Sequence, residues 1–436
     1  MISMIDVENC LRTNTWNGYL ELRGEKLSLR SIKIENGQIH TEECTREGVG
    51  IRAIDKREAF LSSNMTDLEK KVKKAISAAS EGDKHLNLKE CNPLEMKEPC
   101  ILSFGSLTET VSLLKTFYED VKKDHHFSVS IHYKEIEGEK CICTSEGINA
   151  EKEVAFWTMS VEVTEKINRR YIRATEETGS KTHYMEPWGI KEHILRKVNS
   201  QIKGMPSKSG RFPCVLGPIA AGTIVHEAVG HMCEADFADQ CLRWMREQQI
   251  APDIVTIRDD GLYPGGFGTE QVDDEGVPTR AVTIIKKGVL NMFLTDRLYA
   301  ERLELPLTGS ARGESFEVKP LIRMRTLVVK EGTADTDELM EDIHFGYLCC
   351  SPQGATVKNF RFRMGLQECY EIRNGEIGNP VVPHCVEGDT FSFLENIEAL
   401  GKKSDAAHFE CEKEQKIQVS QISPSILMGK EGIFFH

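Results

Sequence analysis

Residues 222–237 read GTIVHEAVGHMCEADF and contain the residue types of a metal-dependent hydrolase. In the H-E-x-x-H signature of zinc peptidases, two histidines four residues apart share one face of a helix, and the glutamate between them serves as general base. Here His226 and His231 are five residues apart, with Glu227 directly after the first. A regular α-helix would separate them by about 140° around its axis, which is too far for one ion.

The longer spacing is compatible with a metal site only if the helix is distorted. A π-type turn, with its i→i+5 hydrogen bond, returns both histidines to one side of the helix. Gly230 precedes His231 and tolerates unusual backbone angles, so we expect the distortion there. The competing interpretation is that two histidines fall near a glutamate by chance and are packed as ordinary core residues. Spacing alone does not choose between these two interpretations.

A catalytic zinc site needs a third protein ligand and an open position for water. Glu234 lies three residues after His231 on the same helical face. It could ligate the ion, or it could orient a histidine by a hydrogen bond. Cys233 is expected to point away and to pack in the core. A distant acid or cysteine is equally compatible with the pattern, so the spacing leaves the third ligand open.

The elements around this motif are predicted to form an α+β fold. Polar and apolar residues alternate over 18–54, and Asn36-Gly37 in their middle predicts an antiparallel hairpin with a tight turn. Apolar residues at helical spacing predict helices over 66–80, 107–123 and 188–204. We expect Thr108 to be the N-cap of the second helix. The apolar run before His226 is interpreted as a strand or loop.

The segment 205–214, MPSKSGRFPC, has the Pro, Ser and Gly content of a linker. We therefore expect two domains, over 1–204 and 205–436, each with mostly antiparallel sheets and flanking helices. Strand patterns dominate the second domain, in which two short helices are expected near 296–304 and 335–342. Asn374-Gly375 predicts a further hairpin turn.

Composition limits the classes of function. The chain has 436 residues, 40% hydrophobic and 28% charged, which is typical of a folded protein with a sizeable core. Its formal net charge of −13 argues against nucleic-acid binding, which needs a concentrated basic face. No apolar run approaches the length of a membrane span, and the first residues lack the pattern of a secretion signal. We expect a cytoplasmic protein with reduced, mostly structural cysteines.

The stretch LGPIAAGTIVHEAVGHMCEADFADQ (216–240) resembles the TldD/PmbA family, and in particular its TldD-type members, which are also called modulators of DNA gyrase. The likeness continues through 256–324 and covers essentially all of 205–436. It includes the acidic runs Asp259-Asp260-Gly261 and Asp273-Asp274-Glu275-Gly276, together with Arg312.

This resemblance implies a set of roles. His226 and His231 would bind zinc, Glu227 would be the catalytic base, and Cys411 would be the third ligand as a thiolate. Arg312 is a candidate for holding the substrate or an oxyanion. The implied activity is hydrolysis of unfolded or leader peptides, bound in extended form as an added β-strand. The implied partner is a second copy of the chain or a PmbA-type subunit that lacks the metal motif, without direct contact to nucleic acid or membrane.

The sequence also departs from the family pattern at three places. Glycines around the distal cysteine are replaced in 411–416, a glycine-rich stretch is replaced by 348–357, and position 326 is Thr where relatives have Asn. These changes favour an alternative, a non-catalytic peptide-binding or scaffold subunit. The intact His226-Glu227-His231 set favours the enzyme. A nucleic-acid-binding regulator of gyrase lacks the basic patch it would need.

Overall fold

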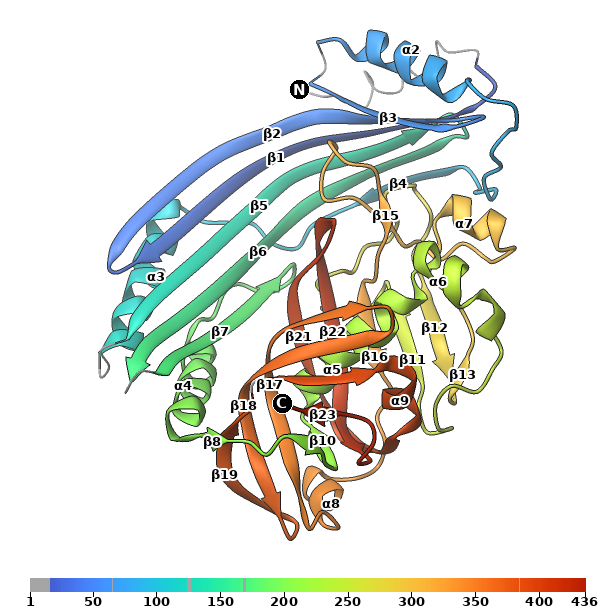
Figure 1. Cartoon of the computed structure of the whole chain (residues 1–436). Helices are drawn as coiled ribbons and strands as arrows, with labels where there is room; N and C mark the ends of the chain where they lie inside the picture. Colours follow the sequence, from blue (N-terminus) through green and yellow to red (C-terminus); the bar gives the residue numbers. More distant parts are fainter. Residues whose placement is uncertain (1–15, 65, 124–126, 168–169, 384) are drawn as a thin grey trace.

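The computed structural model describes residues 16–64, 66–123, 127–167, 170–383 and 385–436. Within them the chain has the predicted mixed α+β fold with mostly antiparallel sheets. Figure 1 shows an N-terminal sheet of long strands that arches over a C-terminal body, in which a second sheet surrounds the helix α5. Among the described helices, none has both the length and the apolar character that crossing a membrane requires.

The N-terminal sheet has seven strands in the order β3-β2-β1-β5-β6-β4, with β7 also paired to β6. Its strands are β1 (Tyr19–Glu35), β2 (Gln38–Ile54), β3 (Glu58–Ser63), β4 (Leu94–Glu98), β5 (Ser128–Thr144), β6 (Ile148–Ile167) and β7 (Arg170–Ser180). The predicted turn at Asn36-Gly37 joins β1 to β2. Both turn residues have positive φ, 51° and 82°, as a two-residue hairpin turn of type I′ requires.

Three helices pack against this sheet at the predicted places: α2 (Leu68–Ala79), α3 (Leu107–Lys122) and α4 (Trp188–Lys203). The predicted N-cap of α3 is wrong. Ser106 caps the helix, because its side chain accepts from the Glu109 N–H while the Glu109 side chain accepts from the Ser106 N–H. This reciprocal pair satisfies two helix-terminal donors, an arrangement that Thr108 does not make.

The C-terminal sheet has fourteen strands, and a separate two-stranded ribbon lies beside it. The sheet strands are β8 (Met205–Pro206), β9 (Gly210–Arg211), β10 (Cys214–Leu216), β11 (Ile257–Asp260), β12 (Ala281–Lys286), β13 (Val289–Leu290), β16 (Thr326–Val329), β17 (Phe345–Lys358), β18 (Arg361–Arg373), β19 (Glu376–Val382), β20 (Val386–Asp389), β21 (Ile397–Lys413), β22 (Gln415–Met428) and β23 (Phe434–Phe435). The ribbon is β14 (Ala311–Arg312) and β15 (Leu321–Ile322). The predicted Asn374-Gly375 turn joins β18 to β19.

The helices of this body are short: α5 (Pro218–Val225), α6 (Ala235–Cys241), α7 (Arg297–Arg302), α8 (Thr336–Met340) and α9 (Thr390–Glu395). The predicted short helices are α7 and α8, whereas α6 and α9 were not predicted. The apolar run before His226 begins with a strand, β10, as expected, but most of it is the helix α5, which was not expected. This helix packs against β22, β17 and β21 and is buried on most of its surface, so its sequence is apolar all round and shows no amphipathic pattern.

Buried charges connect the N-terminal sheet to the loop over residues 270–279. Lys152 of β6 lies 3.2 Å from Glu270 and 3.6 Å from Asp274, and Arg52 of β2 pairs with Glu275. Glu275 also accepts a hydrogen bond from the backbone of Arg297. These pairs fix the loop against the first sheet. The strands of the two sheets lie on either side of residue 204, and the domain boundary placed there stays a prediction.

Candidate metal centre

The helix that carries the motif is distorted in the predicted way. Residues His226–Gly230 form a π-turn, in which the N–H of His231 bonds to the carbonyl of His226. The expected reason for Gly230 is wrong, because its angles are ordinary helical ones, φ −60° and ψ −56°. Glycine is needed for space instead: a Cβ there would lie 1.9 Å from Met324 Sδ.

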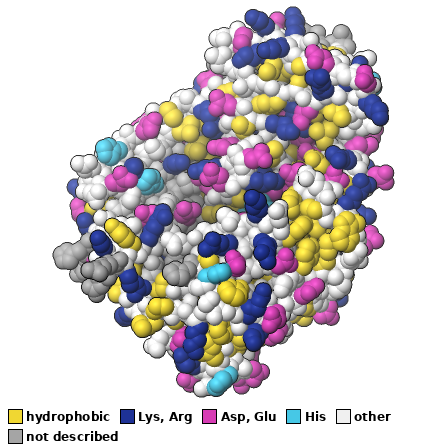
Figure 2. All heavy atoms as spheres, in the orientation of Figure 1, with side chains coloured by type: hydrophobic (Ala, Val, Ile, Leu, Met, Phe, Trp, Pro, Cys, Tyr) yellow, Lys and Arg dark blue, Asp and Glu magenta, His cyan; other side chains and the backbone are white. Residues whose placement is uncertain are grey.

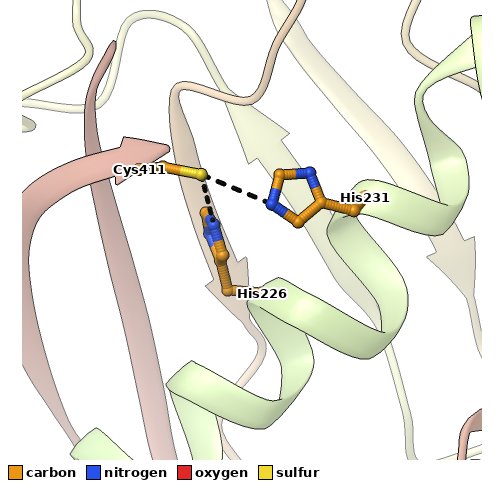
Figure 3. A group of neighbouring side chains, drawn as sticks. All are labelled: His226, His231 and Cys411. Atoms are coloured by element: carbon orange, nitrogen blue, oxygen red, sulfur yellow. Dashed lines mark hydrogen bonds between the residues drawn. The ribbon is translucent and has the colours of Figure 1, made fainter. Parts of the chain in front are cut away.

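The π-turn brings the two histidines together around Cys411, as Figure 3 shows. Cys411 Sγ lies 3.3 Å from His226 Nε2 and 3.3 Å from His231 Nε2. The cysteine comes from β21, far along the chain, while the histidines extend α5. The three donor atoms lie within 4.8 Å of one another, so these side chains could hold one metal ion.

Neighbouring side chains hold the second histidine in place. Glu234, which is fully buried, accepts a hydrogen bond at 3.0 Å from His231 Nδ1, leaving Nε2 for the cluster. The same carboxylate lies 2.7 Å from Lys413 Nζ. Of the two roles left open for Glu234, the geometry is that of an orienting group: it contacts the far nitrogen of the histidine and is not one of the three donors.

Arg323 fixes the hairpin that carries Cys411. Its guanidinium donates to the carbonyl oxygens of Cys411 at 2.8 Å, Lys413 at 3.2 Å and Gln415 at 2.8 Å. The tight turn between β21 and β22 places Glu414 at φ +62°, where glycine is more usual. The buried arginine therefore holds this divergent turn in place, and the thiol stays in the cluster.

The charges of the cluster favour the metal-binding protonation state of Cys411 and oppose that of His231. Burial alone would raise the pKa of Cys411, but the neighbouring His226 and hydrogen bonds from both histidines lower it to about 4. The thiol is therefore a thiolate at neutral pH, which is the form that binds metal. Burial lowers the pKa of His231, whereas the Glu234 carboxylate raises it, with a net value of about 10. A metal ion must therefore displace a proton from His231.

The donor set fits a zinc ion. With zinc–nitrogen bonds of about 2.0–2.1 Å and a zinc–sulfur bond of about 2.3 Å, tetrahedral ligands lie roughly 3.5 Å apart, close to the observed nitrogen–sulfur separations. Two imidazoles and a thiolate are ligands that zinc accepts, and three protein ligands leave a fourth position for substrate or water.

The cluster opens into a cavity of about 1450 Å³ between the two sheets. Its walls come from β6, β7, α4, β17 and β21, besides the helix of the motif. Glu227 lines this cavity next to the histidines, and burial raises the pKa of its carboxyl group. A carboxylate beside the donor cluster and open to the cavity is placed to exchange a proton with a bound molecule.

Family models match a segment near the N-terminus and most of the C-terminal half of the chain. The model for the PmbA/TldA metallopeptidase C-terminal domain matches residues 209–433, and the model for PmbA/TldA metallopeptidase domain 1 matches residues 20–81. The first match alone covers more than half of the chain. The chain belongs to the PmbA/TldA metallopeptidase family.

Members of this family resemble the chain over nearly its whole length. A zinc metalloprotease TldD homolog from Saccharolobus solfataricus is 28% identical over 433 residues, covering 94% of this chain and 95% of the relative. The fold is shared with a protein described as a modulator of a DNA gyrase from Thermotoga maritima, at TM-score 0.81, 18% identity and coverage of 99% and 100%. It is also shared with TldE from Thermococcus kodakarensis, at TM-score 0.78, 20% identity and coverage of 98% and 99%.

Arg312, a candidate for holding the substrate, does not line the cavity of this PmbA/TldA metallopeptidase family member. Its side chain is buried, donates to the carbonyl of Met324 at 2.6 Å and is not part of the cavity wall. Its predicted substrate role therefore has no support in this placement. Cys233 is fully buried in the core, as expected. On the face drawn in Figure 2, basic and acidic side chains are interspersed.

Sequence reasoning missed Arg323 and Lys413, which hold the hairpin of Cys411 and the Glu234 carboxylate. Neither residue has a spacing relation to the motif that marks it in advance. Lys413 lies two residues after the predicted third ligand, which was the single available signal.

Proposed function

We propose that this chain is a zinc-dependent metallopeptidase that hydrolyses unfolded or leader peptides bound in extended form in the cavity. His226, His231 and Cys411 would hold the zinc ion. The observation that carries the proposal is their convergence beside Glu227 at the base of a cavity large enough for a peptide segment. A metal bound there would polarise the scissile carbonyl and lower the pKa of the attacking water.

The side chains of the motif divide the remaining work. Glu227 accepts the proton of the attacking water at its carboxylate and returns it to the leaving amine. Burial raises the pKa of its carboxyl group, which makes Glu227 a stronger proton acceptor than an exposed glutamate. Glu234 and Lys413 keep His231 in the tautomer whose Nε2 faces the cluster.

Edge strands support binding of an extended peptide. Within the described residues, β7 pairs only with β6, and its outward edge, the one away from β6, faces α4 and the C-terminal body. The outward N–H and C=O groups of Arg173 and Thr175 are bonded by the side-chain amides of Gln201 and Gln367. Since outward groups recur every two residues, those of Glu177 onward face the same side, along the cavity wall. A peptide can add to this part of the edge as a strand.

A comparison of wild type with Glu227→Gln tests the enzymatic proposal. Bound zinc is measured by elemental analysis, and cleavage of an unfolded protein is followed by mass spectrometry. We expect one zinc per chain in both proteins, and a loss of at least 100-fold in kcat for the variant, because general-base catalysis contributes about 10²–10⁴-fold. Glu398→Gln, an exposed site on β21 outside the cavity wall, is the control.

The same measurements test the alternative of a non-catalytic peptide-binding or scaffold subunit. The structural likeness to TldE is the observation that supports this alternative. The same likeness suggests a TldE-type subunit as the partner. Wild-type protein that binds peptide but neither retains zinc nor cleaves would favour the scaffold. We further propose that the chain forms a dimer with itself or with a TldE-type subunit, which light scattering of the purified and co-expressed proteins would measure.

A further inference from the structure

The tip of the β17–β18 hairpin departs from the other two-residue hairpin turns of the described chain, which have Gly at their second position. Lys358 pairs with Arg361, so Asn359 and Phe360 form a two-residue turn with φ values of 49° and 63°. Such type I′ turns favour Asn-Gly, and the chain uses Asn-Gly in the turns after β1 and after β18. A bulky aromatic residue with positive φ is an outlier, and residues held in this way cluster at functional sites.

The ring of Phe360 occupies a defined place in the cavity wall. It lies 5.5 Å from the ring of Phe237 on α6 and 5.4 Å from the ring of Phe391 on α9. Phe360, Phe237 and Met232 line the cavity together with His231. Both Phe360 and Phe237 remain half-buried, so part of each ring stays open to a molecule in the cavity.

The strained turn is tied to the helix that carries the metal-binding histidines. The N–H of Thr390 donates to the carbonyl of Phe360 at 2.7 Å, and the Thr390 hydroxyl donates to the carbonyl of Ala228 at 3.3 Å. Ala228 belongs to the π-turn between the histidines. A single residue thus links the position of the Phe360 ring to the position of the cluster.

We propose that Phe360 and Phe237 form a specificity subsite that receives a bulky apolar side chain of the peptide close to the bond that is cut. The inference rests on the proposed peptidase function. A glycine at position 360 would form this turn without strain. We therefore attribute the role of the aromatic ring to its contacts in the cavity wall and not to the turn. Elsewhere the cavity wall mixes apolar side chains, such as Trp157 and Phe409, with charged ones on β7 and β21, such as Glu177 and Glu410, which disfavour an apolar group beside them.

Phe360→Gly removes the ring without straining the turn, because Asn-Gly is the favoured pair for this turn type. The variant therefore tests the subsite with little effect on the stability of the fold. The probe is a set of otherwise identical unfolded peptides that carry Leu, Phe or Ala at each position in turn, with kcat/KM read from product formation. We expect wild type to prefer Leu or Phe over Ala at one position by about 10–200-fold, the range for apolar pockets. In Phe360→Gly this ratio should fall below about threefold, while Phe360→Leu should keep a preference for Leu.

Phe345→Ala is the matched control. Phe345 is also a half-buried ring of the same hairpin, packed on Phe212, but it lies outside the cavity wall. This variant should keep the wild-type ratio even if its melting temperature falls. An unchanged ratio in Phe360→Gly, or an equal loss for all peptides, would overturn the subsite.

Binding of the same peptides to Glu227→Gln, and to Glu227→Gln combined with Phe360→Gly, distinguishes the two proposals. If wild type cleaves nothing but the first protein binds Leu peptides more tightly than the second, the subsite stands and the peptidase fails. If wild type cleaves and the two proteins bind all peptides alike, the peptidase stands and the subsite is refuted.

Discussion

A single buried carboxylate determines how the second histidine faces the cluster. Glu234 combines a hydrogen bond to His231 with ion pairing to Lys413. Burial raises the pKa of this carboxyl group, but these partners outweigh burial and lower the pKa to about 2. It therefore stays charged at neutral pH. A charged acceptor on Nδ1 fixes the tautomer and makes Nε2 a stronger donor to a metal.

Glu234→Gln should weaken zinc binding by about 10–100-fold, since loss of a group that orients a ligand has that effect. The amide can still accept from His231 Nδ1, but it carries no charge and leaves Lys413 without its closest partner. Competition with a chromogenic chelator measures the affinity. Glu412→Gln, an exposed neighbour of Cys411, should keep the wild-type value. Equal affinities for all three proteins would show that Glu234 is only a packing residue.

At the level of secondary structure, the π-turn allows two histidines that are five residues apart to face the same site. One inserted residue rotates His231 back to the side of His226 and keeps Glu227 facing the cavity. The turn is held by packing, because Gly230 lies against Met324 with no room for a methyl group. Met324 is itself buried, so it has little space into which to move.

Gly230→Ala should destabilise the protein by about 1–3 kcal/mol, the usual cost of an overpacked core. Because the clash is with the end of the Met324 side chain, the double variant with Met324→Ala should lose less stability than the sum of the two single variants. Chemical unfolding of the four proteins measures this coupling. Strict additivity would mean that the close approach to Met324 does not set the need for glycine.

Across the whole molecule, ion pairs centred on Glu270 connect the N-terminal sheet to the C-terminal body. Glu270 of the C-terminal half lies 3.2 Å from Lys152, 3.1 Å from Lys181 and 3.4 Å from Arg325. Burial raises the pKa of its carboxyl group, but these three cations outweigh burial and hold the pKa well below its usual range. The carboxylate therefore stabilises the folded state.

Glu270→Gln should lower the melting temperature at pH 7 by several degrees, because it leaves three cations without their shared partner; breaking a buried pair costs roughly 3 kcal/mol. A carboxylate with a depressed pKa stabilises the fold fully above its ordinary pKa, about 4.3, and this contribution is lost as the pH falls through the folded value. The difference between wild type and variant should thus narrow below about pH 4. Glu398→Gln serves as an exposed control, and a constant difference down to about pH 2 would contradict the assignment.

Much of the local structure could be predicted from the sequence because it depends on neighbours in the chain. The Asn-Gly turns after β1 and β18 need positive φ at adjacent residues, and helical spacing identified α2, α3 and α4. The H-E-x-x-x-H spacing predicted a π-turn, because a shared ion and a regular helix are incompatible at five residues. By contrast, α5 could not be recognised as a helix, since burial on most of its surface removes the amphipathic period.

By itself the sequence determined which residues could do the chemistry and how the helix beneath them must bend. Cys411 lies 180 residues after His231, and its place in the cluster follows from the pairing of β21 with β22 and the hold of Arg323. The position of the Phe360 ring in the cavity wall depends likewise on its contacts with α6 and α9. Only the tertiary structure decided these positions, because the distances that matter lie between segments whose separation along the chain carries no periodic signal.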